Sequence, residues 1–179
     1  MHRSSLLLLL QNYFPTAQEE VVAKQQMVDF IEENLNCFER TLEHGHITGS
    51  AWLLNNDGSK ALLMHHNKLN LWVQLGGHCD GDSDVLRVAC KEAQEESGIK
   101  TIIPVSPAIF DVDIHLIPGN SREKEHYHYD VRFLLRVASD EQVVQNNESK
   151  ELRWVGKDAA SLPTQSLSVV RMFNKWISR

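Results

Sequence analysis

The segment KEAQEESGI, residues 91–99, carries three glutamates at spacings of three and four. A helix would bring Glu92, Glu95 and Glu96 onto one face, where their charges repel unless a cation lies near them. Carboxylate oxygens on a rigid helix suit Mg²⁺ or Mn²⁺, because such ions combine a few carboxylates with water and substrate phosphates. The alternative is a solvated acidic helix face, which is common in proteins, and the spacing alone leaves both open.

The flanking residues predict a helix over 84–97 with well-marked ends. Asp82 or Ser83 is expected to cap its start, because short polar side chains accept hydrogen bonds from the first backbone amides of a helix. Gly98 suits the left-handed residue that often follows the last turn. The glutamates therefore lie in the second half of a rigid element.

The apolar residues of this helix divide into two stripes at 100° per residue. The first stripe is predicted to face the core and consists of Leu86, Ala89, Cys90 and Ala93. Val85 and Val88 lie on the second stripe, which the three glutamates continue. A fully solvated face would not need two valines at its start, so we expect the glutamates to face a partly enclosed pocket.

Two glycines, Gly76 and Gly77, end a short predicted strand just before the helix and permit close backbone approach to a phosphate. Residues 77–99 resemble the Nudix box, G-x5-E-x7-R-E-U-x-E-E-x-G-U, in which U is apolar. In this register Gly77 matches the first glycine, and Glu92 matches the glutamate that follows the arginine. The later glutamate pair of the motif is Glu95-Glu96.

The chain departs from the motif at two positions. Ser83 stands where the family has its first glutamate, and Lys91 stands where it has an arginine. Lysine keeps the positive charge but lacks the rigid two-pronged donor of arginine. The departures therefore alter the support of the predicted metal site while the later glutamates are intact.

The resemblance implies an enzyme that uses Mg²⁺ or Mn²⁺ to hydrolyse a diphosphate bond in a nucleoside diphosphate linked to another moiety. It implies that Glu92, Glu95 and Glu96 are metal ligands and that Lys91 assists them. The general base would be one of these three glutamates or a glutamate outside the box. Family members often take such an extra carboxylate from a loop, for which Glu148 or Glu151 is our candidate; solvated loop charges are the alternative. Two other functions stay open: a Nudix-fold module that binds a nucleotide or phosphorylated metabolite with little turnover, and an isomerase of a prenyl diphosphate.

Histidine is abundant, with nine residues. In an extended strand, His126, His128 and Asp130 share one face of the segment HYHYD. In the segment DVDIH, one face is shared in the same way by Asp111, Asp113 and His115. If these segments pair as a hairpin, they form an imidazole-rich surface that His78 and Asp80 could approach. Three interpretations are open: hydrogen-bonded sheet histidines, substrate contacts by Gly76, Gly77, His78, His126 and His128, or a second site for a softer metal such as zinc, iron, nickel or copper.

The composition excludes some functions and favours others. A net charge of −6 with no lysine- or arginine-rich tract disfavours nucleic-acid or membrane binding through a basic patch, whereas a small diphosphate substrate remains compatible. The three cysteines Cys37, Cys79 and Cys90 are widely spaced, which predicts free thiols and a cytoplasmic location. The LLLLL run near the start predicts a short first helix that ends near Pro15 and could bury against a second copy as a homodimer.

The element pattern predicts an α+β fold, a Nudix-like α/β/α sandwich around a mixed sheet. A helical extension over 1–45, with a capping box at Thr16 and Glu19, precedes a hydrolase domain over 46–179. Besides the glutamate helix, strands are predicted over 47–55, 60–66, 71–75, 108–117, 126–138 and 152–155, with a last helix over 166–177.

Overall fold

The computed structural model describes residues 2–119 and 124–179; four residues of the predicted polar loop over 118–125, residues 120–123, lie outside this part. The elements are α1 (Ser4–Gln11), α2 (Gln18–Glu33), β1 (Gly45–Leu54), β2 (Lys60–His66), β3 (Trp72–Val73), β4 (Leu75–His78), α3 (Val85–Ser97), β5 (Ile102–Ile117), β6 (His126–Val137), β7 (Ser149–Gly156), the 3₁₀ turn η1 (Ala159–Ser161) and α4 (Leu167–Ile177). Helices and strands are present at the predicted positions, with two differences. The strand predicted over 71–75 is divided between β3 and β4, which continues through Gly76 and Gly77, and β5 begins six residues earlier than expected. None of the helices in the described residues is long and apolar enough to cross a membrane.

The strands form one mixed sheet with the order β3-β2-β1-β6-β5, to which β4 adds on β1 and β7 on β2. The central pair β1 and β6 is parallel, with His46 opposite His128, whereas the other pairs are antiparallel. The expected hairpin of the two histidine-bearing strands is confirmed by β5 and β6, which place Asp113 opposite Asp130. The predicted mixed sheet is therefore correct.

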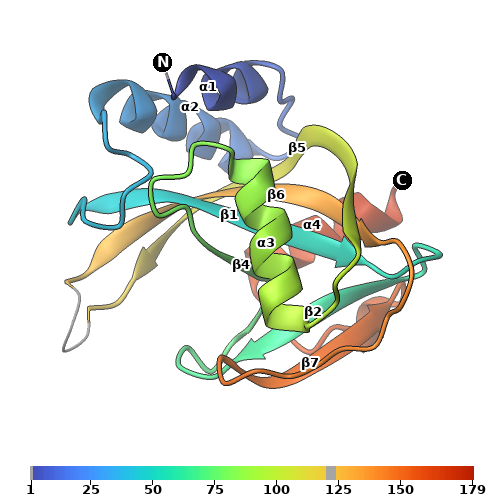
Figure 1. Cartoon of the computed structure of the whole chain (residues 1–179). Helices are drawn as coiled ribbons and strands as arrows, with labels where there is room; N and C mark the ends of the chain where they lie inside the picture. The colour runs from blue at the N-terminus through green and yellow to red at the C-terminus, as the bar shows by residue number, and fades with distance from the viewer. Residues whose placement is uncertain (1, 120–123) are drawn as a thin grey trace.

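Helices cover both faces of the curled sheet (Figure 1), which confirms the predicted sandwich. The sheet has a hydrophobic core on each face, and alternate residues of β1 contribute to one core or the other, because successive strand side chains point to opposite faces. Ala51 and Leu53 belong to the core beneath α1, α2 and α3, whereas Trp52 and Leu54 pack with α4. Both faces of β1 are buried along its whole length, as expected for a central strand.

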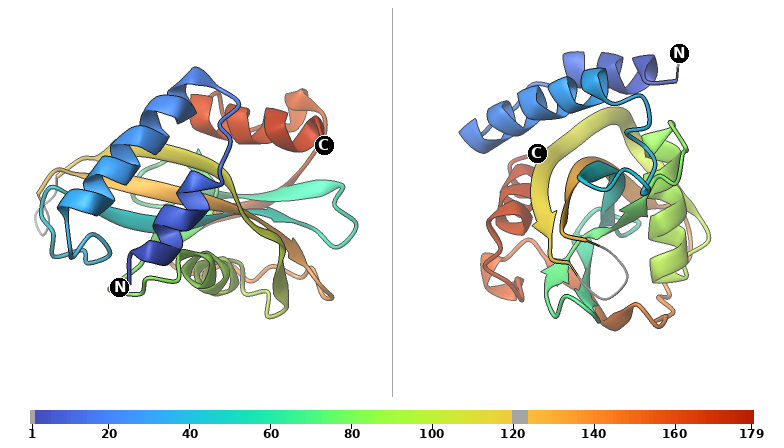
Figure 2. Two further views of the ribbon diagram at one scale, coloured as in Figure 1. Left: turned by 90° about the horizontal axis from the view of Figure 1, so that it is seen from above. Right: turned by 90° about the vertical axis from the view of Figure 1, so that its left-hand side faces the viewer.

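The N-terminal helices lie against the edge of the domain next to β5 (Figure 2). Leu6 and Leu10 of α1 are fully buried in the shared core, so two leucines of the apolar run pack within their own chain. The predicted capping box is displaced by one residue, because Ala17 is the N-cap of α2 and Glu20, not Glu19, accepts from its backbone N–H. Glu20 is better suited to this role because it also reaches the Tyr13 hydroxyl and Lys175.

A cluster of buried charges lies on the histidine-bearing strands β5 and β6 themselves. The Arg132 side chain is 2% exposed and donates to three carboxylates, at 2.7 Å to Asp130, 2.9 Å to Asp111 and 3.2 Å to Asp113. Arg171 of α4 also donates to Asp111 and Asp113. Burial by itself would raise the pKa of Asp111 and Asp113, but these ion pairs and hydrogen bonds hold the pKa of both carboxyl groups below the usual range.

The network predicts that stability falls as the pH falls through the acid range. A carboxyl group whose pKa is lower in the folded than in the unfolded chain stabilises the fold above the unfolded pKa of about 3.9, and this stabilisation is lost on protonation. We expect the urea midpoint of the wild type to drop steeply below about pH 4. The Asp113→Asn variant should start from a lower midpoint and show a shallower acid dependence, and equal slopes would contradict the assignment. Urea unfolding followed by circular dichroism between pH 7 and 3 measures both.

Candidate active site

Helix α3 presents the three glutamates and is held firmly at both ends. Its N-cap is Asp84 rather than the expected Asp82 or Ser83, because the Asp84 carboxylate accepts from the Arg87 N–H. Asp82 instead forms an ion pair of 2.7 Å with the Arg87 guanidinium. Gly98 follows the helix with a φ of 73°, in the left-handed conformation predicted for it.

The buried face of α3 differs in part from the predicted stripe. Val85 and Val88 are fully buried in the core, whereas Leu86 and Cys90 are only partly buried. The helix approaches β1 closely at Gly49, where an added Cβ would lie 2.8 Å from the Val85 carbonyl oxygen. This close approach turns the valines onto the sheet, so they are part of the core rather than the wall of a pocket.

The glutamates nevertheless face a cleft of about 540 Å³, which Glu92, Glu95 and Glu96 line together with Glu148. Glu96 is the most enclosed of them, at 3% exposed, and one of its oxygens accepts the Gly76 N–H at 2.8 Å. Burial, together with nearby glutamate charges, raises the pKa of Glu96 to about 8 and also raises the pKa of Glu92. Several carboxylates are therefore held in a place that favours a cation.

Lys91 lies beside Glu92 and Glu95, and its side chain is 60% exposed. Its ammonium group is 3.2 Å from a Glu92 oxygen and 3.4 Å from a Glu95 oxygen. Lys91 therefore offsets part of the repulsion between these two glutamates, which is compatible with the assisting role expected of it. Ser83 takes no part in this set and lies in the turn before the helix.

The two candidates for an extra carboxylate lie in different places. Glu148 lines the cleft, and its backbone is anchored because its carbonyl oxygen accepts the Asn67 N–H at 2.7 Å. Glu151 lies in β7, where it pairs with Arg153 at 2.7 Å and does not line the cleft. The geometry therefore brings only Glu148 to the helix glutamates.

Gly76 and Gly77 lie in β4 and line the cleft, as their position just before the helix suggested. A Cβ on Gly77 would lie 2.5 Å from a Glu92 oxygen, so the backbone here leaves room only for the glutamate. A Cβ on Gly76 would lie 2.7 Å from the Ser50 Cα of β1, and Gly76 has a φ of 157°. Glycine is thus required for the backbone of β4 to pass between β1 and the helix.

We expect Gly76→Ala to destabilise the protein by about 1–3 kcal/mol, as overpacking does, and to displace the N–H that holds Glu96. Gly156→Ala is the matched control, because a Cβ on that strand glycine would meet no atom within 4 Å. Urea unfolding of both variants measures the difference. Equal midpoints for Gly76→Ala and the wild type would show that the backbone can shift freely there.

The histidine-bearing strands form the wall of the cleft beside the glycines. Asp130 lines the cleft and accepts hydrogen bonds from Thr48, Ser50 and Gln74 at 2.7 to 3.0 Å. His78 and His128 also line it. The candidate substrate-binding residues Gly76, Gly77, His78 and His128 therefore lie around one cleft, whereas His126 is buried behind it.

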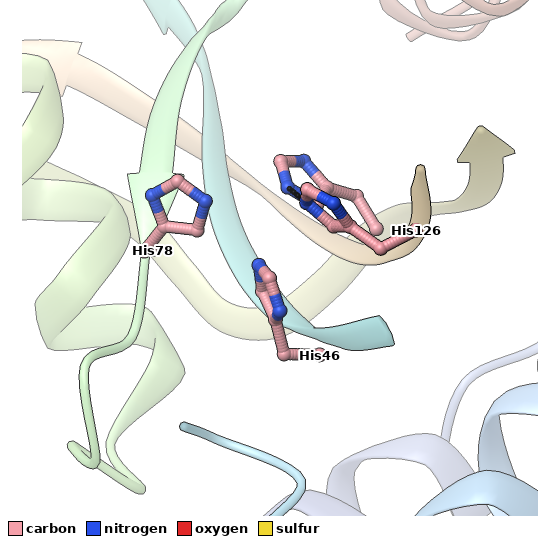
Figure 3. A group of neighbouring side chains, drawn as sticks. His46, His78 and His126 are labelled. Atoms are coloured by element: carbon pink, nitrogen blue, oxygen red, sulfur yellow. Dashed lines mark hydrogen bonds between the residues drawn. The ribbon is translucent and has the colours of Figure 1, made fainter. Parts of the chain in front are cut away.

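Figure 3 shows that His46, His78 and His126 point toward one another. One ring nitrogen from each of these residues and from His128 lies within 4.8 Å of the others. His46 was not among the predicted site residues, because only the parallel pairing of β1 with β6 places it opposite His128. His115 instead contacts Asp113, with its Nδ1 at 3.2 Å from the carboxylate.

The donor set around α3 fits a hard divalent cation such as Mg²⁺ or Mn²⁺. Glu92, Glu95 and Glu96 provide oxygens on a rigid helix, and the cleft leaves room for water and phosphate. A cation would also offset the unfavourable burial of the Glu96 charge, which the Gly76 N–H alone does not remove. These three residues would hold the ion.

Comparisons with known proteins agree with this arrangement. Solved structures with similar folds include a NUDIX-family hydrolase from Clostridium perfringens (23% identity, 73% of this chain and 95% of that chain, TM-score 0.52). A MutT NUDIX hydrolase from Burkholderia pseudomallei (22%, 74% and 98%, 0.55) and the dihydroneopterin triphosphate pyrophosphohydrolase of E. coli (16%, 74% and 94%, 0.55) are similar too. No curated protein matches the sequence.

At these identities the solved structures establish the fold and not the substrate. The sequence itself matches the family model described as the NUDIX domain over residues 45–175. This match includes the glycine pair, helix α3 and the histidine-bearing strands, which are the elements that build the cleft. Because the match covers well over half of the chain, this protein belongs to the Nudix hydrolase family.

Proposed function

We propose that the protein hydrolyses a diphosphate bond in a nucleoside diphosphate linked to another moiety, with Mg²⁺ or Mn²⁺ as the cofactor. The observation that carries the proposal is the buried Glu96 carboxylate, which shares one cleft with Glu92, Glu95 and Glu148. Structural carboxylates are normally paired when they are buried. Within the described residues Glu96 accepts a hydrogen bond only from the Gly76 N–H, at 2.8 Å, which suits a group that serves a metal and its phosphate ligand.

When bound, the metal would neutralise phosphate oxygens and make water more acidic. Glu92, Glu95 and Glu96 would hold the ion, and Lys91 would limit the repulsion between the first two. Glu148 is our candidate for the general base, because it lines the cleft from a separate loop and can face the helix glutamates across the substrate. Glu151 is a weaker candidate, because Arg153 occupies its carboxylate.

The rest of the cleft would position the substrate. Gly76 and Gly77 would allow the diphosphate to approach the backbone closely, and His78 and His128 offer imidazoles beside these glycines. The cleft has a volume of about 540 Å³, which lies in the range of small-molecule sites. The similar structures include an Ap4A hydrolase, a dihydroneopterin triphosphate pyrophosphohydrolase and an ADP-ribose pyrophosphatase, so the fold is compatible with several moieties linked to the diphosphate.

A Nudix-fold module with little turnover is the second candidate, and Ser83 and Lys91 are the residues that favour it. In this structure Arg87 pairs with Asp82 at the start of α3, and Lys91 bridges Glu92 and Glu95. Ion pairs of Arg87 and Lys91 therefore hold the helix and its glutamates although two motif residues differ, and this favours the enzyme over the binding module. An isomerase of a prenyl diphosphate has no specific support in the described residues.

A panel of substrates tests the proposal. Nucleoside diphosphate sugars, dinucleotides, nucleoside triphosphates and CoA derivatives are incubated with the protein and Mg²⁺ or Mn²⁺, and release of phosphate or nucleotide is measured. A rate well above that with the metal alone supports the enzyme. Saturable binding of a compound without product, measured by calorimetry on the same panel, would instead support the binding module.

Two further proposals concern the cellular location and the oligomeric state of the protein. A cytoplasmic location agrees with the free thiols of Cys37, Cys79 and Cys90, two of which are buried. Self-association as a homodimer through the first helix stays a prediction. Leu8 of that helix is exposed, whereas Leu6 and Leu10 are used by the core of the same chain.

A further inference from the structure

Four imidazoles gather beside the cleft, on three neighbouring strands of the sheet. His46 comes from β1, His78 from the end of β4, and His126 and His128 from β6. Their rings are close: the centroid of His46 is 4.9 Å from those of His78 and His126 and 5.0 Å from that of His128. In this sheet the pairing of β1 with both β4 and β6 holds the four side chains together.

His46 lies at the centre of this group and is 2% exposed. Neither of its ring nitrogens has a hydrogen-bond partner among the residues that the structure describes. The Leu42 carbonyl lies near enough to favour a protonated ring, but without hydrogen-bond geometry. A buried polar group without a partner costs about 1–3 kcal/mol, so an additional ligand for His46 is expected here.

The ring of His126 shows which of its nitrogens such a ligand could use. The Nδ1 of His126 lies 2.8 Å from the Lys124 carbonyl oxygen, which can only accept, so Nδ1 carries the proton. The Nε2 of His126 is then an acceptor, and it faces the Nε2 of His128 at 3.3 Å. A hydrogen bond from one ring nitrogen to a backbone carbonyl is also the usual way in which a metal-binding histidine is oriented.

The distances suit a tetrahedral ion. Zinc–nitrogen bonds of about 2.0–2.1 Å place two nitrogens of a tetrahedral site roughly 3.3 Å apart. The His126 and His128 nitrogens already have this separation, and the ligand nitrogens of all four residues lie within 4.8 Å of one another. Small side-chain movements would therefore complete the site.

The four rings also bring nitrogen lone pairs to one place, because one ring nitrogen of each residue lies within 4.8 Å of the others. Neutral imidazole provides the lone pair that a metal requires. The Nε2 atoms of His126 and His128 can share one proton at 3.3 Å, whereas the buried ring of His46 beside them has no hydrogen-bond partner among the described residues, and a dication would use its lone pair.

We propose that His46, His78, His126 and His128 form a binding site for one borderline transition-metal dication, with Zn²⁺ as its representative. Four nitrogen ligands favour Zn²⁺, Co²⁺ or Ni²⁺ over Mg²⁺, which prefers oxygen. The site is separate from the glutamates of α3 and does not depend on the proposed hydrolytic function. Since His78 and His128 also line the cleft, the ion would lie beside the cleft and would join three strands.

Metal binding by the intact protein tests the proposal. The protein is stripped with a chelator and titrated with Zn²⁺ against a chromophoric competitor, and Co²⁺ is added separately to record the visible absorption of a tetrahedral site. We expect one tight equivalent in the wild type. His46→Asn and His128→Asn should weaken it by at least about 100-fold, which exceeds the usual effect of losing an outer hydrogen bond to a ligand.

His44→Asn is the matched control, because His44 is exposed and only two residues from His46. It should retain wild-type affinity, and Glu96→Gln should retain it as well, because the glutamate site is separate. Equal affinity of His46→Asn and the wild type, or no tight equivalent at all, would overturn the proposal. If the variants fail to fold, X-ray absorption of the zinc-loaded wild type decides: nitrogen ligation at about 2.0–2.1 Å with imidazole scattering is expected, and an oxygen-only shell contradicts it.

Discussion

Glu96→Gln is expected to reduce metal-dependent hydrolysis by at least about 100-fold, more than the usual cost of a lost outer hydrogen bond at a metal site. The amide has the shape of the carboxyl group but carries no charge, so it is a poor ligand for Mg²⁺ or Mn²⁺. The same side chain is the most buried glutamate of α3, at 3% exposed, so water cannot readily replace it. Initial rates on the best substrate of the panel, across a range of Mg²⁺ concentrations, measure the loss.

The fold should survive this change. Burial raises the pKa of Glu96 to about 8, so without a cation the carboxyl group is largely neutral near pH 7. The glutamine oxygen can still accept the Gly76 N–H, which lies 2.8 Å from the carboxylate oxygen. We therefore expect circular dichroism spectra and urea midpoints close to those of the wild type.

A matched variant, Glu32→Gln, removes a glutamate charge from the exposed face of α2 and should keep full activity. Glu95→Gln should lose metal-dependent turnover as Glu96→Gln does, although its side chain is exposed. Full activity in both Glu95→Gln and Glu96→Gln would refute the enzyme that we propose. An inactive protein with an altered circular dichroism spectrum would instead point to loss of the fold and would leave Glu95→Gln as the test.

Arg132→Leu is expected to cost about 3–5 kcal/mol of unfolding free energy, because removing one partner of a buried ion pair leaves the other charges uncompensated. The Arg132 side chain is 2% exposed and its guanidinium reaches Asp111, Asp113 and Asp130. Arg171 remains near the first two carboxylates, but Asp130 keeps only hydroxyl and amide donors. For a chain of this size, the melting temperature should fall by roughly 6–20 °C.

Arg153→Leu is the control for this prediction. Arg153 pairs with Glu151 on the surface and is 46% exposed, and exposed pairs contribute about 0–1 kcal/mol. Urea unfolding of both variants at pH 7 separates the two cases. If Arg132→Leu unfolds at the same urea concentration as Arg153→Leu, the buried charges are compensated by water rather than by the arginine.

The sequence alone was sufficient for the local elements and the family. Period-two and helical patterns predicted most of the strands and helices, because side-chain periodicity is a local property. They did not separate β3 from β4, and they placed the start of β5 six residues too late. The register of the glycine pair and the glutamates identified the Nudix box, since these residue types at these spacings are constrained together. Glu92, Glu95 and Glu96 were placed on one face of a helix for the same reason.

The predictions that were wrong concern features that depend on tertiary packing. The orientation of α3 toward Gly49 buries Val85 and Val88 more deeply than Leu86, and helix periodicity cannot tell which stripe faces a sheet. The cap of α3 is Asp84, because three neighbouring polar residues compete and only the path of the chain selects one. The capping glutamate of α2 is Glu20, because it also meets Tyr13 and Lys175 from distant parts of the chain.

The sequence by itself therefore determined the fold class, the glutamate helix and the presence of an imidazole-rich pair of strands. Only the tertiary structure decided that Glu148 rather than Glu151 reaches the cleft, and that His46 joins the histidines of β4 and β6. The physical reason is that strand register and the pairing of distant strands depend on the summed burial of two whole faces of the sheet. No short stretch of sequence encodes that sum, so contacts between distant strands come from the folded chain alone.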